Sequence, residues 1–217
     1  MDWNRRWAKE KNLPKIFWHK AWADNVEKIA NLVWEKNTKY LTLWALSTDN
    51  LQKRDSKETQ AIIKLINNIE NFLDKMIKKW LKFETIWDIS KLPLESQEIL
   101  KKVKEKTKNN NWLVLTIALV YWWWDEIIRA TKKIIKAWLK IDEITQEKFR
   151  EFLDTNFLPK VDLIIRTGWD IRHSGFMLFD SEYSEYYFTQ KKWPEFDKNE
   201  LEKAYNFFYN SKRNFWK

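Results

Sequence analysis

The chain has 217 residues, no cysteine and a formal net charge of +9, with 40 Lys and Arg against 31 Asp and Glu. This length suits one sizeable domain, and the lack of cysteine excludes disulfides, thiolate metal sites and a cysteine nucleophile. The basic balance favours acidic partners, namely nucleic acid, phosphorylated substrates or an anionic membrane surface. We expect a cytoplasmic protein, because the charged N-terminus has no signal-peptide pattern and the longest apolar stretch, 112–124, is too short to span a membrane.

Helical and strand patterns alternate along the chain. Apolar spacing and strand-forming runs predict, in order, a helix over 25–36, a strand over 40–46, a long helix from Ser56, a strand over 81–86, a helix over 95–106, a strand over 113–120, helices over 125–137 and 146–153, a strand over 161–165 and a helix over 198–208. The run at 113–120 is almost wholly apolar, which is typical of a central strand buried on both faces. We therefore expect an α/β fold with a mostly parallel central sheet flanked by helices, forming a single domain over 1–217.

Tryptophan and glycine have abnormal frequencies. The chain has 16 Trp and 2 Gly, whereas about 7% glycine, or roughly fifteen, is usual for this length. Several tryptophans stand where glycine is expected: Trp122–Trp124 after an apolar strand, Trp138 at the end of a helical pattern and Trp169 after Gly168. We interpret most of them as glycines, since the codon UGA is read as Trp in one variant genetic code and as Gly in another.

With glycine at those positions, a series of motifs emerges. They are D-G-N-R-R-W-A at 2–8, F-G-H-K-A-G at 17–22, I-G-D at 86–88, I-R-T-G-G-D-I-R-H-S at 165–174 and R-N-F-G at 213–216, while L-T-L-W-A-L-S-T-D-N at 41–50 needs no change. In this order, they make the whole chain resemble the cis-prenyltransferases, the undecaprenyl diphosphate synthase or isoprenyl transferase family. The same comparison keeps tryptophan at 7, 34, 44 and 193, and assigns glycine to 3, 18, 22, 80, 87, 112, 122, 123, 124, 138, 169 and 216.

The residue types in these motifs suit diphosphate chemistry. A loop around Asp2 and Asn4 that contains a glycine offers open backbone N–H groups, with a neighbouring guanidinium for phosphate. Arg166, Arg172 and Ser174 follow a strand and form a second candidate anion site. Carboxylates such as Asp2 and Glu185 are suitable oxygen ligands for Mg²⁺.

The resemblance implies roles for particular residues. Asp2 and Asn4 would be catalytic, Asp2 and Glu185 would hold Mg²⁺, and Arg166, Arg172 and Ser174 would bind isopentenyl diphosphate. The allylic diphosphate, usually farnesyl diphosphate, would bind at Trp3, Asn4, Arg5, Arg6, Trp7, Lys15, His19, Ser47, Asn50 and Arg54. The product would be a long-chain polyprenyl diphosphate, such as undecaprenyl diphosphate for cell-wall synthesis.

The resemblance also implies partners. A homodimer is expected, in which the C-terminal segment 213–216 of one copy completes the site of the other. Peripheral contact with the inner face of the membrane is expected of an enzyme that makes a lipid, and nucleic acid is not expected as a partner.

Three features depart from the family pattern. Met1 falls where the family ends its first strand, so we expect the chain to be truncated at its N-terminus. Position 124, usually arginine, is Trp here. Twelve indoles in place of glycine, at about 1–3 kcal/mol for each overpacked buried site, exceed the roughly 5–15 kcal/mol of a typical domain, so we expect the chain as written to be inactive and poorly folded.

Two other functions remain open at this stage. A basic, aromatic-rich chain is also typical of proteins that bind single-stranded nucleic acid by stacking bases on indoles. A basic membrane-surface protein without catalysis is the third possibility. Both account for the charge, and neither accounts for the ordered motifs.

Overall fold

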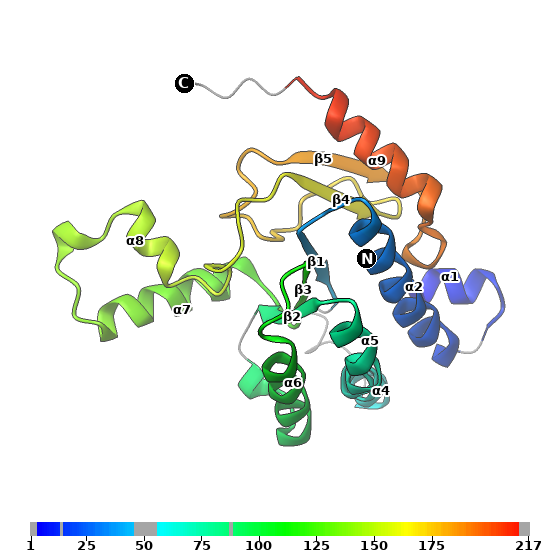
Figure 1. Cartoon of the computed structure of the whole chain (residues 1–217), viewed down its shortest axis with the longest axis horizontal. Helices are drawn as coiled ribbons and strands as arrows, with labels where there is room; N and C mark the ends of the chain where they lie inside the picture. The colour runs from blue at the N-terminus through cyan, green and yellow to red at the C-terminus, as the bar shows by residue number, and fades with distance from the viewer. Residues whose placement is uncertain (1–3, 14, 46–55, 87–88, 213–217) are drawn as a thin grey trace. The chain divides into compact units, whose positions relative to one another are not determined.

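The computed structural model describes residues 4–13, 15–45, 56–86 and 89–212 (Figure 1). These residues belong to two compact units, each described by itself. Unit 1 comprises Met1–Leu32, Lys160–His173 and Ser181–Lys217, and unit 2 comprises Val33–Pro159 and Ser174–Asp180. The single domain stays a prediction.

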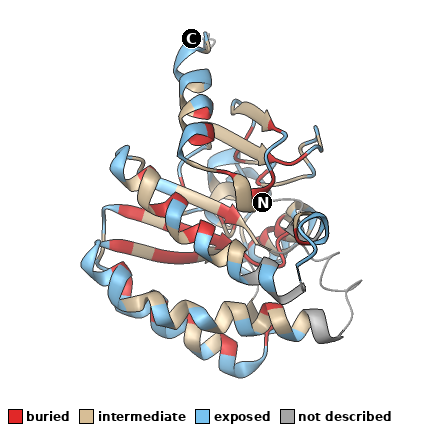
Figure 2. Cartoon of the chain, turned by 90° about the vertical axis from the view of Figure 1, so that its right-hand side faces the viewer, coloured by how far each residue is buried: buried red, intermediate tan, exposed pale blue. Residues whose placement is uncertain are grey.

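Unit 2 is built on a parallel three-stranded sheet of β1 (Tyr40–Trp44), β2 (Leu81–Ile86) and β3 (Leu113–Ala118), in the order β1-β3-β2. The central strand is β3, as its apolar run predicted. Its residues Leu113 and Ala118 are fully buried, and Phe83 of β2 pairs with Leu115. Figure 2 shows how the buried residues concentrate in the strands and on one side of the helices.

Helices of unit 2 pack beside this sheet and continue from it. The helical segments are α4 (Ser56–Asn67), η1 (Asn68–Phe72), α5 (Leu73–Lys78), η2 (Ile89–Lys91), α6 (Leu94–Thr107), α7 (Trp123–Lys136), η3 (Ile141–Glu143) and α8 (Gln146–Glu151). Figure 1 shows α6 beside β2, and the pair α7 and α8 leading away from β3. The hydroxyl of Thr107 accepts a hydrogen bond from the backbone N–H of Phe83 at 3.1 Å, which fixes the end of α6 on β2.

Unit 1 contains the parallel pair β4 (Leu163–Thr167) and β5 (Glu185–Thr189), with α1 (Asn4–Glu10), α2 (Lys15–Glu35, its last three residues in unit 2), η4 (Trp193–Glu195) and α9 (Lys198–Asn210). The Asn25 side chain on α2 donates to the carbonyl oxygens of Trp193 at 2.5 Å and Phe196 at 3.1 Å. These bonds attach α2 to η4, so unit 1 is held together by residues far apart in the chain.

The carboxylate of Glu200 attaches α9 to β5. It accepts hydrogen bonds from Thr189 at 2.6 Å and Tyr187 at 2.9 Å, and it pairs with Lys203 at 3.1 Å. Burial alone would raise the pKa of Glu200, but these donors and the lysine hold it below its usual value, whereas burial and the Glu200 carboxylate raise the pKa of Tyr187 to about 12. Glu200 is therefore bound in its ionised form.

Several element bounds differ from the sequence prediction. The first long helix begins at Lys15 instead of residue 25, because residues 15–24 contain good helix formers such as Lys20, Ala21 and Ala23 and no proline. The helix from Ser56 breaks into α4, η1 and α5 around Asn67 and Asn68, since asparagine is a weak helix former. Residues 4–10 form α1 instead of a loop, and β5 was not predicted as a strand. Among the described residues, no helix is both long enough and apolar enough to cross a membrane.

Candidate functional site

The loop after β4 brings two predicted site residues together. Arg166 and Arg172 both pair with the carboxylate of Asp170: Arg166 Nη2 lies 3.7 Å from Oδ2, and Arg172 Nη1 lies 2.9 Å from Oδ1. Arg166 also donates to the carbonyl oxygen of Arg172. The two guanidiniums therefore converge on one anionic group beyond the carboxyl end of a parallel strand, the edge where α/β sheets bind ligands.

Gly168 makes this loop possible. Its φ is +94°, in the left-handed region that favours glycine, and its N–H donates to the carbonyl oxygen of Lys191 at 2.8 Å. The chain bends at Gly168 and Trp169, directly after β4, and Asp170 lies within reach of Arg166.

Ser174, the third residue of this predicted site, begins the segment that belongs to unit 2. The ring of Phe176 stacks on Trp44 with centroids 5.0 Å apart and meets Tyr121 edge-on at 5.9 Å. Gly175 touches the Trp123 indole so closely that an added Cβ would lie 2.2 Å from it. The half-buried Trp44 is thus a packing residue of its strand, and it holds the segment after Ser174.

Three residues here adopt left-handed backbone conformations: Val120 (φ +53°), Ser174 (φ +55°) and Met177 (φ +49°). Left-handed φ is a strained conformation for a β-branched residue such as Val120, which lies just beyond β3. Such strain is often stored at functional sites. Within unit 2, these three residues place such strain at the carboxyl end of the central strand and in the segment that begins at Ser174.

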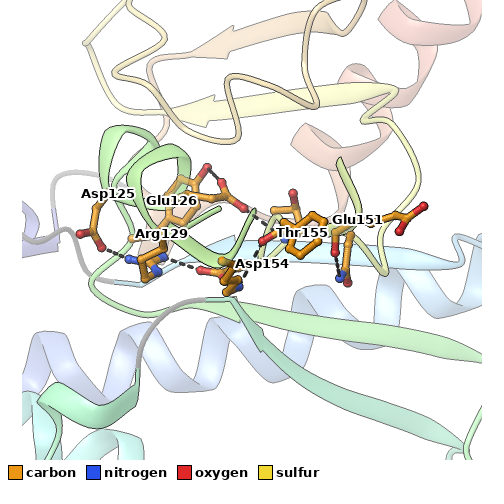
Figure 3. A network of polar contacts seen from close by, with 10 residues as sticks. Asp125, Glu126, Arg129, Glu151, Asp154 and Thr155 are labelled. Atoms are coloured by element: carbon orange, nitrogen blue, oxygen red, sulfur yellow. Dashed lines mark hydrogen bonds and ion pairs between the residues drawn. The ribbon is translucent and has the colours of Figure 1, made fainter. Parts of the chain in front are cut away.

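A buried polar network follows Val120 (Figure 3). Glu126, only 2% exposed, accepts hydrogen bonds from the Tyr121 hydroxyl at 2.6 Å and the Thr155 backbone N–H at 3.1 Å. Burial raises the pKa of Glu126, although the bond from Tyr121 opposes this, and burial with the neighbouring Glu126 raises the pKa of Tyr121. This carboxyl therefore joins the start of α7 to the turn after α8.

Arg129 adds an ionic layer to the network. It forms ion pairs with Asp125 one turn earlier and with Asp154, and Lys133 reaches Asp154 at 3.0 Å. Figure 3 shows Arg129 between the two carboxylates. In the same unit Arg150 pairs with the buried Asp180, so α7, α8 and the segment that begins at Ser174 are cross-linked by charge.

The residues predicted to bind the allylic substrate are mostly not described. Asp2, Trp3, Ser47, Asn50 and Arg54 lie outside the described residues. Asn4 and Arg5 are in α1 and Lys15 and His19 in α2, with side chains that are not described. Arg6 is exposed and Trp7 half-buried on α1. The grouping of these residues in one site stays a prediction.

Glu185 lies at the beginning of β5, opposite Leu163, and its backbone N–H donates to the carbonyl of Asp162 at 2.9 Å. Arg166 pairs three residues further along, with Phe188, about 10 Å away along the strand. The half-buried Glu185 carboxylate makes no hydrogen bond or ion pair with any described residue, so it is open to a cation. Within the described ranges, no three carboxylate or imidazole groups cluster as a metal site.

Two polar residues, Asp170 in unit 1 and Glu126 in unit 2, were missed from the sequence. Asp170 stood inside a recognised motif but received no role, although a carboxylate between two arginines is a visible signal. Glu126 gave no signal, because its partner Thr155 is 29 residues away.

A family comparison identifies the chain. The model of the family described as putative undecaprenyl diphosphate synthase matches residues 1–216. The chain belongs to this prenyltransferase family. It is therefore, by family, an isoprenyl transferase, and the nucleic-acid and membrane-surface alternatives gain no support.

Individual prenyltransferases agree with this assignment. The chain is 36% identical over 220 residues to an isoprenyl transferase of Clostridium perfringens, covering 99% of this chain and 87% of the relative. It is 37% identical to the farnesyl-diphosphate-specific ditrans,polycis-undecaprenyl-diphosphate synthase of Micrococcus luteus, covering 99% and 88%. Lavandulyl diphosphate synthase from Lavandula x intermedia, solved with dimethylallyl diphosphate, superimposes with a TM-score of 0.88 at 27% identity, covering 99% and 94%. The predicted α/β fold is confirmed.

Proposed function

We propose that the protein condenses isopentenyl diphosphate in cis onto an allylic diphosphate, with farnesyl diphosphate as primer and a long-chain polyprenyl diphosphate such as undecaprenyl diphosphate as product. The observation that carries the proposal is the convergence of Arg166 and Arg172 on Asp170, at the carboxyl end of β4. A guanidinium binds phosphate oxygens through paired hydrogen bonds, and two of them suit a diphosphate.

The remaining roles follow from the family motifs. Arg166, Arg172 and Ser174 would bind isopentenyl diphosphate, while the residues around Asp2 and Asn4 would bind and activate the allylic diphosphate. Asp2 and the Glu185 carboxylate would hold Mg²⁺, which would neutralise charge on the diphosphate leaving group. Asp2→Ala should abolish Mg²⁺-dependent transfer of labelled isopentenyl units, and Arg172→Ala should raise KM for isopentenyl diphosphate. Unchanged kinetics in both variants would contradict these roles.

We also infer that the twelve tryptophans assigned by the motifs are glycines in the protein that the gene specifies. Four helices end alike, with a left-handed residue two positions beyond the last helical residue: Asn12 after α1, Asn37 after α2, Trp80 after α5 and Trp138 after α7. Glycine is the usual residue at this position and asparagine the next. A bulky L-residue is strained there, so the two tryptophans occupy glycine positions.

Exposure separates the two groups of tryptophans independently. Side chains are described for eight of the twelve, and six of these are exposed: 80, 112, 122, 124, 138 and 169. None of the four retained tryptophans is exposed, and Trp193 is only 3% exposed. The four retained tryptophans are packed, as genuine tryptophans would be, and the six exposed ones are solvated, as indoles at glycine positions would be.

The codons at the sixteen positions test this inference. UGA at the twelve positions and UGG at 7, 34, 44 and 193, with glycine in the peptides of the native protein by mass spectrometry, is the expected result. UGG throughout would overturn it. The expectation that the chain as written is inactive depends on the same inference.

We further propose a homodimer, with peripheral membrane contact during lipid synthesis. Ile128 and Ile135, seven residues apart on α7, are 49% and 69% exposed, and this spacing places them on one helix face. The first turn of this helix carries Asp125, and its last turn carries Lys133 and Lys136. An antiparallel pairing of α7 with a second copy would therefore bury the isoleucines and set acidic ends against basic ends.

A further inference from the structure

The pairing of Asp170 with both arginines has a consequence for ligand binding. Each carboxylate oxygen contacts a different guanidinium, Oδ1 that of Arg172 and Oδ2 that of Arg166. Carboxylate and phosphate oxygens make the same kind of charge-assisted bonds to arginine. Asp170 therefore occupies the position between the two arginines that an oxygen pair of a diphosphate would need.

The exposure of the three side chains indicates which bond is easier to break. The side chain of Arg166 is 14% exposed, that of Asp170 27% and that of Arg172 63%. Ion pairs at a solvated surface are weak, so the Asp170–Arg172 contact is readily exchanged. A diphosphate carries more negative charge than one carboxylate and would displace it.

We propose that Asp170 is an internal counter-ion that holds Arg166 and Arg172 in place while the site is empty and is displaced when a diphosphate binds. It is a positioning residue that sets the affinity of this site. The inference rests on the proposed function, since it takes the arginine pair as the diphosphate site.

Binding of inorganic pyrophosphate, measured by calorimetry, tests the proposal without requiring activity. Asp170→Asn should bind pyrophosphate about two- to five-fold more tightly than the unaltered protein, the range of a weak ion pair removed. Asp170→Glu, which restores the charge, should return the affinity toward its original value. Asp142→Asn, on an exposed turn of unit 2, removes the same charge elsewhere and should leave binding unchanged.

Kinetics provide a second measurement. In the active protein Asp170→Asn should lower KM for isopentenyl diphosphate by a similar factor and leave kcat unchanged. If the chain as written does not fold, the same variants are made in the chain that carries glycine at the twelve positions, and the same measurements apply. Equal or weaker pyrophosphate binding by Asp170→Asn would overturn the counter-ion role of Asp170 and leave the arginine pair as the diphosphate site. No binding by any variant, the unaltered protein included, would overturn the assignment of the arginine pair and the counter-ion with it.

Discussion

Replacing Glu126 with alanine should destabilise unit 2 strongly. The change leaves two buried donors without an acceptor, the Tyr121 hydroxyl and the Thr155 N–H. Each unsatisfied buried donor costs about 1–3 kcal/mol, and removing an ionisable group from a buried position returns part of that cost. We expect a net loss of about 3 kcal/mol, a large share of the roughly 5–15 kcal/mol that stabilise a typical domain.

The loss should depend on pH in a definite direction. Because burial raises the pKa of Glu126 above its unfolded value of 4.5, the folded protein keeps the proton longer than the unfolded chain. The unaltered protein therefore loses stability as pH rises from 4.5 to the folded pKa, and the alanine variant does not. The difference between the two should be largest near the acidic end of this window and smaller above it.

Urea unfolding followed by far-UV circular dichroism, at several pH values, measures both effects. Glu98→Ala, an exposed glutamate on α6, is the matched control and should change stability by less than about 0.5 kcal/mol. A loss below about 1 kcal/mol for Glu126→Ala, or a difference that grows with pH, would refute this account of the network.

Three further predictions concern single changes. Trp138→Gly should stabilise the protein by about 1 kcal/mol, because the change relieves the strain of a left-handed residue that is 91% exposed and so loses little packing. Lys132→Gly, inside α7, is the control and should destabilise the protein by a similar amount. Urea unfolding measures both changes, and a change of the same sign in the two variants would contradict a glycine position at 138. The ionised Glu200 carboxylate contributes stability that is present above its unfolded pKa and lost as pH falls through its lowered folded pKa. Glu200→Gln should therefore lower the free energy of unfolding at neutral pH and have a smaller effect in acid. A loss of stability that does not depend on pH would contradict the ionised state of Glu200. Ile135→Asp should convert a dimer into a monomer in sedimentation experiments, and an unchanged dimer would exclude this face of α7.

The strands of unit 2 could be predicted because their sequences carry local signals. The apolar run at 113–120 is central in the sheet as expected, and Tyr40–Trp44 and Leu81–Ile86 are strands within or at the expected ranges. The start of α2 and the break at Asn68–Phe72 were missed, since helix ends depend on packing as well as on propensity.

The site was predictable only where residues belong to motifs. Arg166, near the end of β4, and Arg172, in the loop after it, were identified because they belong to the motif at 165–174, and the structure brings them to one carboxylate. The Glu126–Thr155 and Asn25–Trp193 bonds join positions 29 and 168 residues apart. Such contacts arise from the tertiary fold and have no local pattern to reveal them.

The most direct test of the proposed function is transfer of labelled isopentenyl diphosphate to farnesyl diphosphate in the presence of Mg²⁺. It would compare the chain as written with the chain carrying glycine at the twelve positions, each produced with whatever in-frame sequence precedes Met1 in the gene. We predict polyprenyl product from the glycine form, abolished by Asp2→Ala, and none from the chain as written. A folded glycine form that makes no product, or equal transfer by both forms, would contradict the account.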